Sequence, residues 1–319
     1  MHDTLGIRRR AGLLLVLLGL SLGLVSPAIA QEGSSDSQNL FLWKATSGSR
    51  TIYLLGSIHL VPPDTYPLAE EIEQAYERSQ ALAVEFDITN VDQGLIQKLV
   101  LEKGMYPAGD DLSKHARKES LELLEPIAEK MGIPIDVLMK FRPWMLTLMV
   151  GVMEVETKGF SAEVGIDKHF LDKAGAAKKR IVELETAEEQ VDLLSSLSPE
   201  LQEMVLFQTL SHLSVVSESA KDLLGAWKTG DEAAMEKAIE ADRNHENEEL
   251  KTYYAKLLDE RNSRMAQRID EHADKDAILF VVVGAGHLVG DRGIVNLLKA
   301  RNFEVVQVKR GRRSAAASK

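Results

Sequence analysis

The chain has 319 residues, with 38 lysines and arginines against 49 aspartates and glutamates, and therefore a net charge of −11. This acidic balance argues against a dedicated nucleic-acid binder, because neutralising phosphates requires a basic face. The sequence contains no cysteine, which excludes disulfides, thiolate zinc sites, iron–sulfur clusters and a cysteine nucleophile. The chemistry of a functional site must therefore come from His, Asp, Glu, Ser, Thr, Lys or Tyr.

The first thirty residues are typical of a cleaved signal peptide. Three arginines at 8–10 precede an apolar run at 11–25, and the small-residue pattern Ala28-Ile29-Ala30 follows. A membrane anchor is the alternative, but a run of fifteen residues is shorter than the roughly 20 needed to span a bilayer. We expect removal of residues 1–30 by way of either the Sec or the twin-arginine route. The product is then a periplasmic or secreted protein without a stable membrane anchor.

The predicted elements follow one another as strands separated by helices. Apolar runs predict strands at 40–44, 51–55, 81–86, 180–184, 277–283 and 303–308, with Ser47-Gly48-Ser49 as the first turn. Helical spacing predicts helices at 64–79, 162–174, 188–228, 231–273 and 290–301, and a mostly helical middle from residue 91 onward. This order favours an α/β fold with a mixed, mainly parallel sheet. We expect a single domain, residues 31–319, with a large helical insertion at about 91–275 that forms a cap.

Two segments share one local form, in which an apolar strand stops at a glycine and a histidine follows three residues later. They are Gly56-Ser57-Ile58-His59 and Gly284-Ala285-Gly286-His287. Ligand crevices in open α/β sheets form at the carboxyl ends of parallel strands. The repeated Gly-x-x-His pattern therefore predicts that His59 and His287 lie together at such an edge. A loop histidine that caps a helix is the alternative for each of them alone.

Glu85 ends a third apolar strand, where a bare carboxylate is costly unless it has a cation or a donor as its partner. Two histidines and one glutamate form a ligand set for a divalent transition metal with open positions. An ion pair between Glu85 and an arginine of the cap, such as Arg142, is the alternative. Motifs of other enzymes are missing from the sequence: H-E-x-x-H, G-x-S-x-G, the Walker loop and a complete G-x-G-x-x-G.

These motifs together resemble the TraB/GumN family, which is related to the TIKI metalloproteases and more distantly to erythromycin-esterase and ChaN-like proteins. The resemblance covers about residues 40–308. Besides the two Gly-x-x-His motifs and Glu85, it rests on Leu42-Trp43-Lys44, Arg142-Pro143-Trp144, Gly165-Ile166-Asp167 and Leu184-Glu185-Thr186. It implies an α/β core with a helical insertion, and a site built from His59, His287 and Glu85.

The resemblance also implies a set of supporting positions: Gly56, Gly284, Arg142, Asp167, Glu185, Arg261 and Asn262. Polar groups of this kind orient metal ligands. Three of them also have a structural alternative. Arg142 would bridge the cap to the core, Glu185 would begin a turn or cap a helix, and Asn262 would be an exposed helix residue.

The expected function is metal-dependent hydrolysis of an amide or ester bond in a peptide or a small molecule. A divalent cation (Zn, Mn or Co) held by His59 and His287, with Glu85 as third ligand or as general base, would activate water. Two alternatives stay open: a metal-free, esterase-like hydrolase that uses a His59–Glu85 pair, and a non-enzymatic periplasmic binding or accessory protein. The sequence does not identify the substrate or the oligomeric state.

Overall fold

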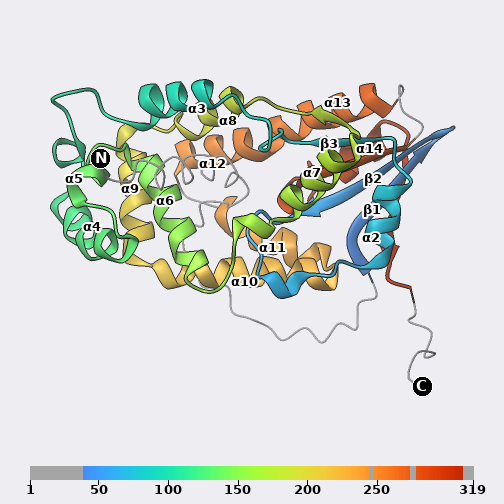
Figure 1. Cartoon of the computed structure of the whole chain (residues 1–319), viewed down its shortest axis with the longest axis horizontal. Coiled ribbons are helices and arrows are strands. Elements are labelled where there is room, and N and C mark those ends of the chain that lie inside the picture. Colours follow the sequence, from blue (N-terminus) through green and yellow to red (C-terminus); the bar gives the residue numbers. More distant parts are fainter. Residues whose placement is uncertain (1–38, 244–246, 274–277, 312–319) are drawn as a thin grey trace, which may run out of the picture.

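The computed structural model describes residues 39–243, 247–273 and 278–311. The predicted signal peptide, residues 1–30, lies outside these residues. Within the described ranges, every helix is too short or too polar to cross a membrane. Figure 1 shows an elongated molecule with the sheet toward one end and a group of helices that includes α4, α5, α6 and α9 toward the other.

The sheet confirms the expected fold class. Its six strands stand in the order β4-β3-β5-β2-β1-β6. Their bounds are β1 Asn39–Ser47, β2 Arg50–Ser57, β3 Ala81–Val84, β4 Arg180–Glu183, β5 Ile278–Gly284 and β6 Glu304–Lys309. Strands β2, β5, β3 and β4 are parallel neighbours, whereas β1 is antiparallel to both β2 and β6. The sheet is therefore mixed and mainly parallel, and all six predicted strands are present.

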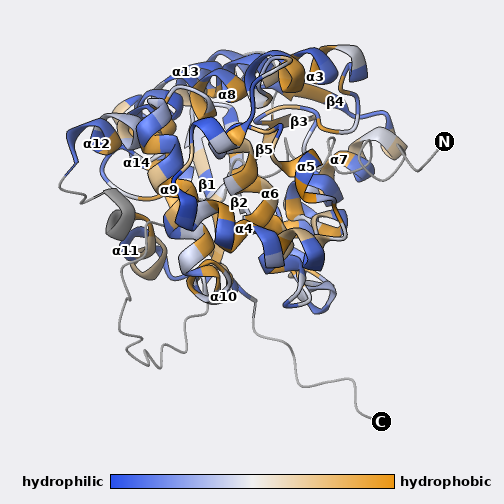
Figure 2. Ribbon diagram, turned by 90° about the vertical axis from the view of Figure 1, so that its left-hand side faces the viewer, coloured by the Kyte–Doolittle hydropathy of each residue, from blue (hydrophilic) through white to orange (hydrophobic). Residues whose placement is uncertain are grey.

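The central strands are covered on both faces, which explains their uninterrupted apolar sequences. Every residue of β3 is buried, as is every residue of β5 after Ile278. On one face the rings of Tyr76, Phe170 and Phe280 lie 5.0–5.6 Å apart and join α2 and α7 to β5. Figure 2 shows the strands between α7 on one side and α14 on the other.

Most of the described helices lie between β3 and β5 in the sequence, and β4 is the one described strand in that stretch. The α-helices are α2 Glu70–Glu77, α3 Gln93–Leu99, α4 Lys118–Met131, α5 Ile135–Leu138, α6 Pro143–Glu156, α7 Ile166–Ala177, α8 Ala187–Leu194, α9 Pro199–Ser211, α10 Leu213–Thr229, α11 Glu232–Arg243, α12 Glu248–Tyr254, α13 Arg261–Ala273 and α14 Ile294–Ala300. Short 3₁₀ or π segments are η2 Pro63–Thr65, η3 Val100–Gly104, η4 Leu112–Lys114, η5 Ala162–Val164, η6 Ala255–Glu260 and η7 Ala285–His287. The helices α4, α6 and α9 share an apolar core of their own, separate from that of the sheet, with Leu124, Leu146 and Leu206 fully buried in it.

Prolines account for two differences from the predicted helices, whereas the helix expected at 231–273 divides into α11, α12, η6 and α13 without a proline. The helix expected at 64–79 begins only at Glu70, because Pro67 cannot supply a backbone donor. The helix expected at 188–228 divides into α8, α9 and α10. Pro199 starts α9, and the Ser198 hydroxyl accepts a bond from the backbone of Leu201 at 3.4 Å.

Candidate functional site

Three adjacent parallel strands bring the predicted residues to one edge of the sheet. β5 lies between β2 and β3, with Ser57 paired to Gly284 and Val84 paired to Val282. The chain leaves each strand at this edge, so the two Gly-x-x-His motifs and the residue after β3 emerge side by side. The expected convergence of His59, Glu85 and His287 is thus what the structure shows.

His59 is held through one ring nitrogen. Its Nδ1 lies 2.9 Å from Oδ1 of Asp167, and the same carboxylate oxygen accepts a bond of 2.9 Å from the Ser57 hydroxyl. Burial alone would lower the pKa of His59, but the carboxylates of Asp167 and Glu85 outweigh it and raise the pKa to about 8. Both ring nitrogens are buried and without a hydrogen bond among the described residues, so the ion pair with Asp167 is what holds Nδ1.

His287 is held in the same way but is neutral. The Asn262 amide nitrogen donates to the Arg292 carbonyl at 3.0 Å, so its oxygen faces His287 and accepts a 2.6 Å bond from Nδ1. The Nε2 atom therefore carries a lone pair. Burial, followed by the nearby charge of Arg261, lowers the pKa of His287 to about 3. This Nε2 lies 3.8 Å from Oε1 of Glu85.

Glu85 is a buried carboxylate held by an arginine, as the alternative to metal binding anticipated, but by Arg261 and not by Arg142. Its Oε2 accepts from Arg261 Nη2 at 2.8 Å and from Gln190 Nε2 at 3.2 Å, and its Oε1 accepts from the Gly284 amide at 2.7 Å. Burial would raise the pKa of Glu85, but Arg261, together with His287 and His59, lowers it to about 2. The side chain is therefore ionised at neutral pH.

Arg261 links this carboxylate to a second one. Its side chain is 1% exposed, and its Nη2 donates to Glu185 Oε2 at 2.6 Å as well as to Glu85. Gln190 lies between the same two carboxylates, at 3.2 and 3.3 Å. The pKa of Arg261 is raised because the two glutamates outweigh burial. One buried guanidinium thus compensates two buried carboxylates.

Gly284 leaves room at the centre of the site. A Cβ at this position would lie 3.2 Å from Glu85 Oε1, 3.4 Å from the His287 ring and 4.0 Å from His59 Nε2. A side chain at this position would therefore crowd Glu85 and occupy the space between the two imidazoles. Gly56, the matching glycine of the first motif, accepts a 2.6 Å bond from the Trp227 indole through its carbonyl.

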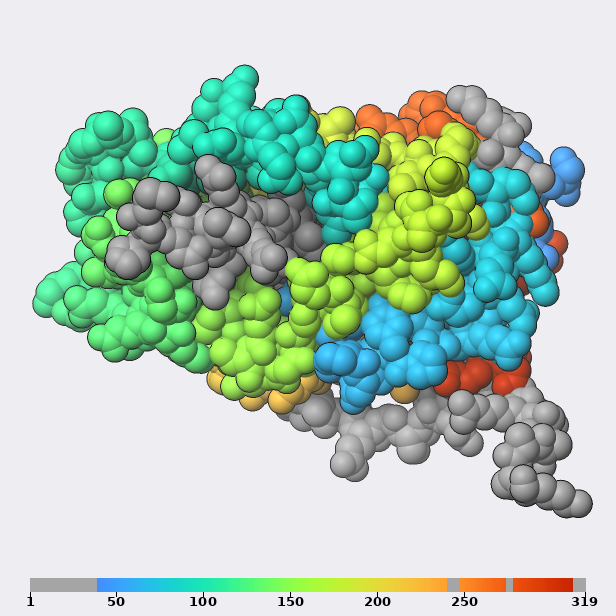
Figure 3. All heavy atoms as spheres, viewed as in Figure 1, coloured from blue at the N-terminus to red at the C-terminus, as the bar shows by residue number. Residues whose placement is uncertain are grey.

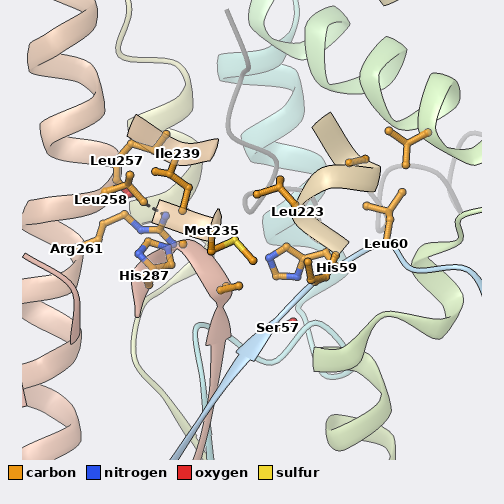
Figure 4. Close-up of a pocket in the computed structure, with 16 residues that line it drawn as sticks. Ser57, His59, Leu60, Leu223, Met235, Ile239, Leu257, Leu258, Arg261 and His287 are labelled. Carbon is orange, nitrogen blue, oxygen red and sulfur yellow. Dashed lines mark hydrogen bonds between the residues drawn. The ribbon is translucent and has the colours of Figure 1, made fainter. Parts of the chain in front are cut away.

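The converging groups open into a small pocket (Figure 4). Its cavity of about 60 Å³ is bounded on one side by Ser57, His59, Arg261 and His287. Apolar side chains from the loop after β2 and from α10, α11 and η6 close the remaining sides. Since one water molecule needs about 10–15 Å³ by this measure, the cavity has room for a few waters or a small chemical group.

Among the predicted supporting residues, Gly284 and Arg261 line the pocket, and Asp167, Glu185 and Asn262 contact residues that line it. Arg142 lies elsewhere. Its Nε donates to the Met105 carbonyl at 3.2 Å and its guanidinium lies over the Tyr106 ring. Arg142 thus joins parts of the cap to one another. Sequence reasoning missed Gln190, Ser57 and Trp227. Ser57 stands inside a motif that had been singled out, whereas a glutamine or a tryptophan on a helix gives no comparable sequence pattern.

The side chains at this edge are of the types that hold divalent cations in proteins. Two electron-rich acceptors, His287 Nε2 and Glu85 Oε1, face each other at 3.8 Å, and the buried His59 Nε2 beside them lacks a partner among the described residues. A histidine that binds a metal through one ring nitrogen is commonly held by a polar partner at the other. Here Asp167 holds His59 and Asn262 holds His287 in this way. Among the described residues, no three His, Asp or Glu side chains lie close enough together to hold a metal ion. An ion would therefore have to draw these donors closer.

Comparison with known proteins shows the family of the chain. The family model described as TraB/PrgY/gumN matches residues 41–307. The chain is 26% identical over 265 residues to "Uncharacterized protein YbaP" of Escherichia coli, covering 82% of this chain and 94% of YbaP. It is 23% identical to "Metalloprotease TIKI2" of Xenopus tropicalis over 89% of this chain and 62% of that protein, and 23% identical to "Metalloprotease TIKI homolog" of Nematostella vectensis over 85% and 67%. No solved structure matches significantly. The family match spans nearly all described strands and helices, and the chain belongs to the TraB/PrgY/gumN family.

Proposed function

We propose that the chain is a hydrolase that cleaves an amide or ester bond with the help of a divalent cation held by His59, His287 and Glu85. The observation that carries this proposal is the convergence of two buried imidazoles, which line the pocket, with the ionised carboxylate of Glu85 beside them. His59, with a pKa of about 8, carries a proton at neutral pH that a bound cation would displace. Distant relatives named metalloproteases support the same reaction class.

The surrounding residues prepare the site for this reaction. Asn262 holds His287 in the tautomer whose Nε2 accepts, and Asp167 fixes the ring of His59. Both oxygens of Glu85 already accept hydrogen bonds, from Gly284 on one side and from Arg261 and Gln190 on the other. Such bonds stabilise the carboxylate against protonation, so we assign Glu85 the role of a ligand rather than that of a general base.

The cation, when bound, would polarise the substrate carbonyl and acidify a water molecule. In the reaction, the oxygen of water bonds to the carbonyl carbon and the bond to the leaving amine or alcohol breaks. One proton of the water goes to the leaving group, and the products are an acid and an amine or alcohol. The apolar side chains that line the pocket lower the polarity around the site, which strengthens its electrostatic interactions.

The direct test is metal content and turnover of the mature chain. Protein purified without a metal-affinity tag is expected to hold about one ion per chain. A chelator should abolish cleavage of a peptide library, and Zn, Mn or Co should restore it. His59→Ala and His287→Ala should lose ion and turnover together, while His115→Ala should retain both, because His115 is paired with Asp110 away from the pocket.

Glu85→Gln separates the two roles of the carboxylate. As a ligand variant it should lose the ion and the turnover in parallel, whereas loss of turnover with the ion retained would identify a general base. Turnover that survives complete removal of metal would reject the metal-assisted mechanism and favour the metal-free hydrolase. A mature protein that binds a ligand in the pocket but cleaves none of the substrates would favour a binding protein.

We also propose that residues 1–30 are a signal peptide and that the mature chain is periplasmic or secreted. The arginines at 8–10, the apolar run and Ala28-Ile29-Ala30 support this. N-terminal sequencing of the expressed protein should find Gln31 or a residue close to it. An intact Met1 on a membrane-bound product would contradict export with cleavage.

A further inference from the structure

The pocket has an apolar side that the proposed reaction does not use. We call it the apolar wall and define it as Leu60, Leu223, Met235, Ile239, Leu257 and Leu258. Leu60 follows β2, Leu223 lies on α10, Met235 and Ile239 lie on α11, and Leu257 and Leu258 lie on η6. The wall is therefore built largely from helices of the insertion and faces the edge of the sheet.

This wall begins directly beside the reactive groups. In Figure 4 the Met235 side chain projects from α11 toward the space between the imidazoles of His59 and His287. Met235 is 1% exposed, and Ile239 is 7% exposed. A Cβ at Gly286, inside the second motif, would lie 3.0 Å from Ile239 Cδ1. The motif that carries His287 is thus also packed against the wall.

The chemistry of the wall selects for an apolar group. All six of its side chains are hydrocarbon or thioether, so a charged or hydroxylated substituent placed there would lose its hydration without a side-chain partner. An aliphatic group, by contrast, gains free energy as its surface leaves water. The wall therefore suits the hydrocarbon part of a substrate whose carbonyl lies between the imidazoles.

The size of the cavity limits the length and shape of that group. A cavity of roughly 150 Å³ lined by similar residues is known to hold benzene, whereas this one measures about 60 Å³. The smaller volume favours a short aliphatic chain over an aromatic ring.

We propose that the apolar wall is the subsite for a short aliphatic acyl group, attached directly to the carbonyl that is hydrolysed. This inference rests on the proposed function, which it deepens by naming the substrate class. The acyl group belongs either to a short fatty acid or to an aliphatic amino-acid residue. Met235 sets the upper size limit, because its side chain is the part of the wall that projects toward both imidazoles.

The first arm of the test is turnover of p-nitroanilides with one common leaving group. Butyryl- and N-acetyl-valyl-p-nitroanilide represent the two sources, and benzoyl-p-nitroanilide is the aromatic competitor. We expect at least one aliphatic substrate to exceed the benzoyl substrate tenfold or more in kcat/KM, since a misfit of one methylene already changes this ratio about 10- to 200-fold. The ratio of the two aliphatic substrates then assigns the source.

The second arm measures binding without catalysis, by calorimetric titration of butyrate and benzoate. The wild-type protein should bind butyrate at least tenfold more tightly. Met235→Ala should raise the relative affinity for benzoate at least tenfold. Met265→Ala is the matched control, because Met265 is equally buried but lies on α13 outside the pocket, and should leave the ratio unchanged.

The two arms separate the failure of the subsite from the failure of the hydrolase. Absence of any turnover, with butyrate still preferred in titration, would reject the hydrolase and retain the subsite. Equal binding of butyrate and benzoate, or an unchanged ratio in a folded Met235→Ala protein, would overturn the subsite. If thermal unfolding shows that Met235→Ala does not fold, the milder Ile239→Ala variant replaces it, and the same shift toward benzoate is required.

Discussion

Removing the guanidinium of Arg261 should destabilise the fold, because this group compensates two buried carboxylates. It is 1% exposed and lies 2.8 Å from Glu85 and 2.6 Å from Glu185. Arg261→Met keeps an unbranched side chain but removes the charge and its donors. Glu85 and Glu185 would then lose the buried cation that they share, and the half-exposed Arg264, 3.8 Å from Glu185, would replace it only in part.

The magnitude follows from the burial of the partners that remain. Removing one member of a buried ion pair costs about 3–5 kcal/mol, because the charge left behind is uncompensated. Since a domain is stable by only about 5–15 kcal/mol, this loss is a large fraction of the total. For a chain of this size it corresponds to a fall in Tm of about 5–10 °C, at roughly 1.5–2 °C for each kcal/mol.

Circular dichroism at pH 7 gives the Tm and, with urea, the free energy of unfolding. Arg292→Met is the matched control, because the Arg292 side chain is 71% exposed and its ion pair with Asp259 is 3.3 Å long, so a change of about 1 kcal/mol or less is expected. Adding Glu185→Gln to Arg261→Met should recover part of the loss, with a coupling of about 0.5–3 kcal/mol. A loss below about 1 kcal/mol for Arg261→Met would refute the reasoning.

Two further predictions concern the loop of His59 and the cap. A Cβ at Gly165 would overlap the backbone carbonyl of His59, so Gly165→Ala should cost about 1–3 kcal/mol of stability and lower turnover at least tenfold. Gly175→Ala is the control and should change neither quantity, because a Cβ there meets no atom within 4 Å. Equal turnover of the two variants would contradict this reasoning. Glu203 accepts bonds from Arg117, and its pKa lies below the ordinary value of 4.5, because these bonds and that of Ser120 outweigh burial. The stabilisation by Glu203 is therefore complete above pH 4.5 and is lost as the pH falls through the lowered pKa. In urea unfolding, Glu203→Gln should be less stable than wild type at pH 7 and nearly equal to it at low pH, and a constant gap would contradict the assignment.

Local sequence patterns were sufficient to predict the sheet. Uninterrupted apolar runs marked β3 and β5, because strands covered on both faces need apolar residues at every position. The repeated Gly-x-x-His pattern then placed His59 and His287 at one edge, since parallel neighbours end together. Helix boundaries were less predictable: apolar periodicity continues through Pro67 and Pro199, although the backbone cannot continue the helix there.

The partners of the site residues were harder to predict than the residues themselves. The resemblance to the family pointed to Asp167, Arg261 and Asn262 but did not state which side chain each would hold. Those pairings depend on how helices return to the sheet. Arg261 and Glu85 are 176 residues apart in the sequence, and Asp167 lies 110 residues from Ser57. A buried carboxylate at the end of a strand predicts that a cation lies beside it. The sequence does not distinguish whether that cation is a metal ion, Arg142 or Arg261.

The division of the site between sheet and helices has a mechanistic consequence. The groups that meet in the pocket follow strands β2, β3 and β5, whereas the groups that hold them lie on α7, α8 and α13, within residues 162–262. Residues at the start of α13 thus set the tautomer of His287 and the ionisation of Glu85. The preceding segment η6, which contributes Leu257 and Leu258 to the apolar wall, runs directly into α13 at Arg261. A shift of η6 would therefore change the size of the pocket and the position of the guanidinium together, which couples substrate fit to the electrostatics of the site.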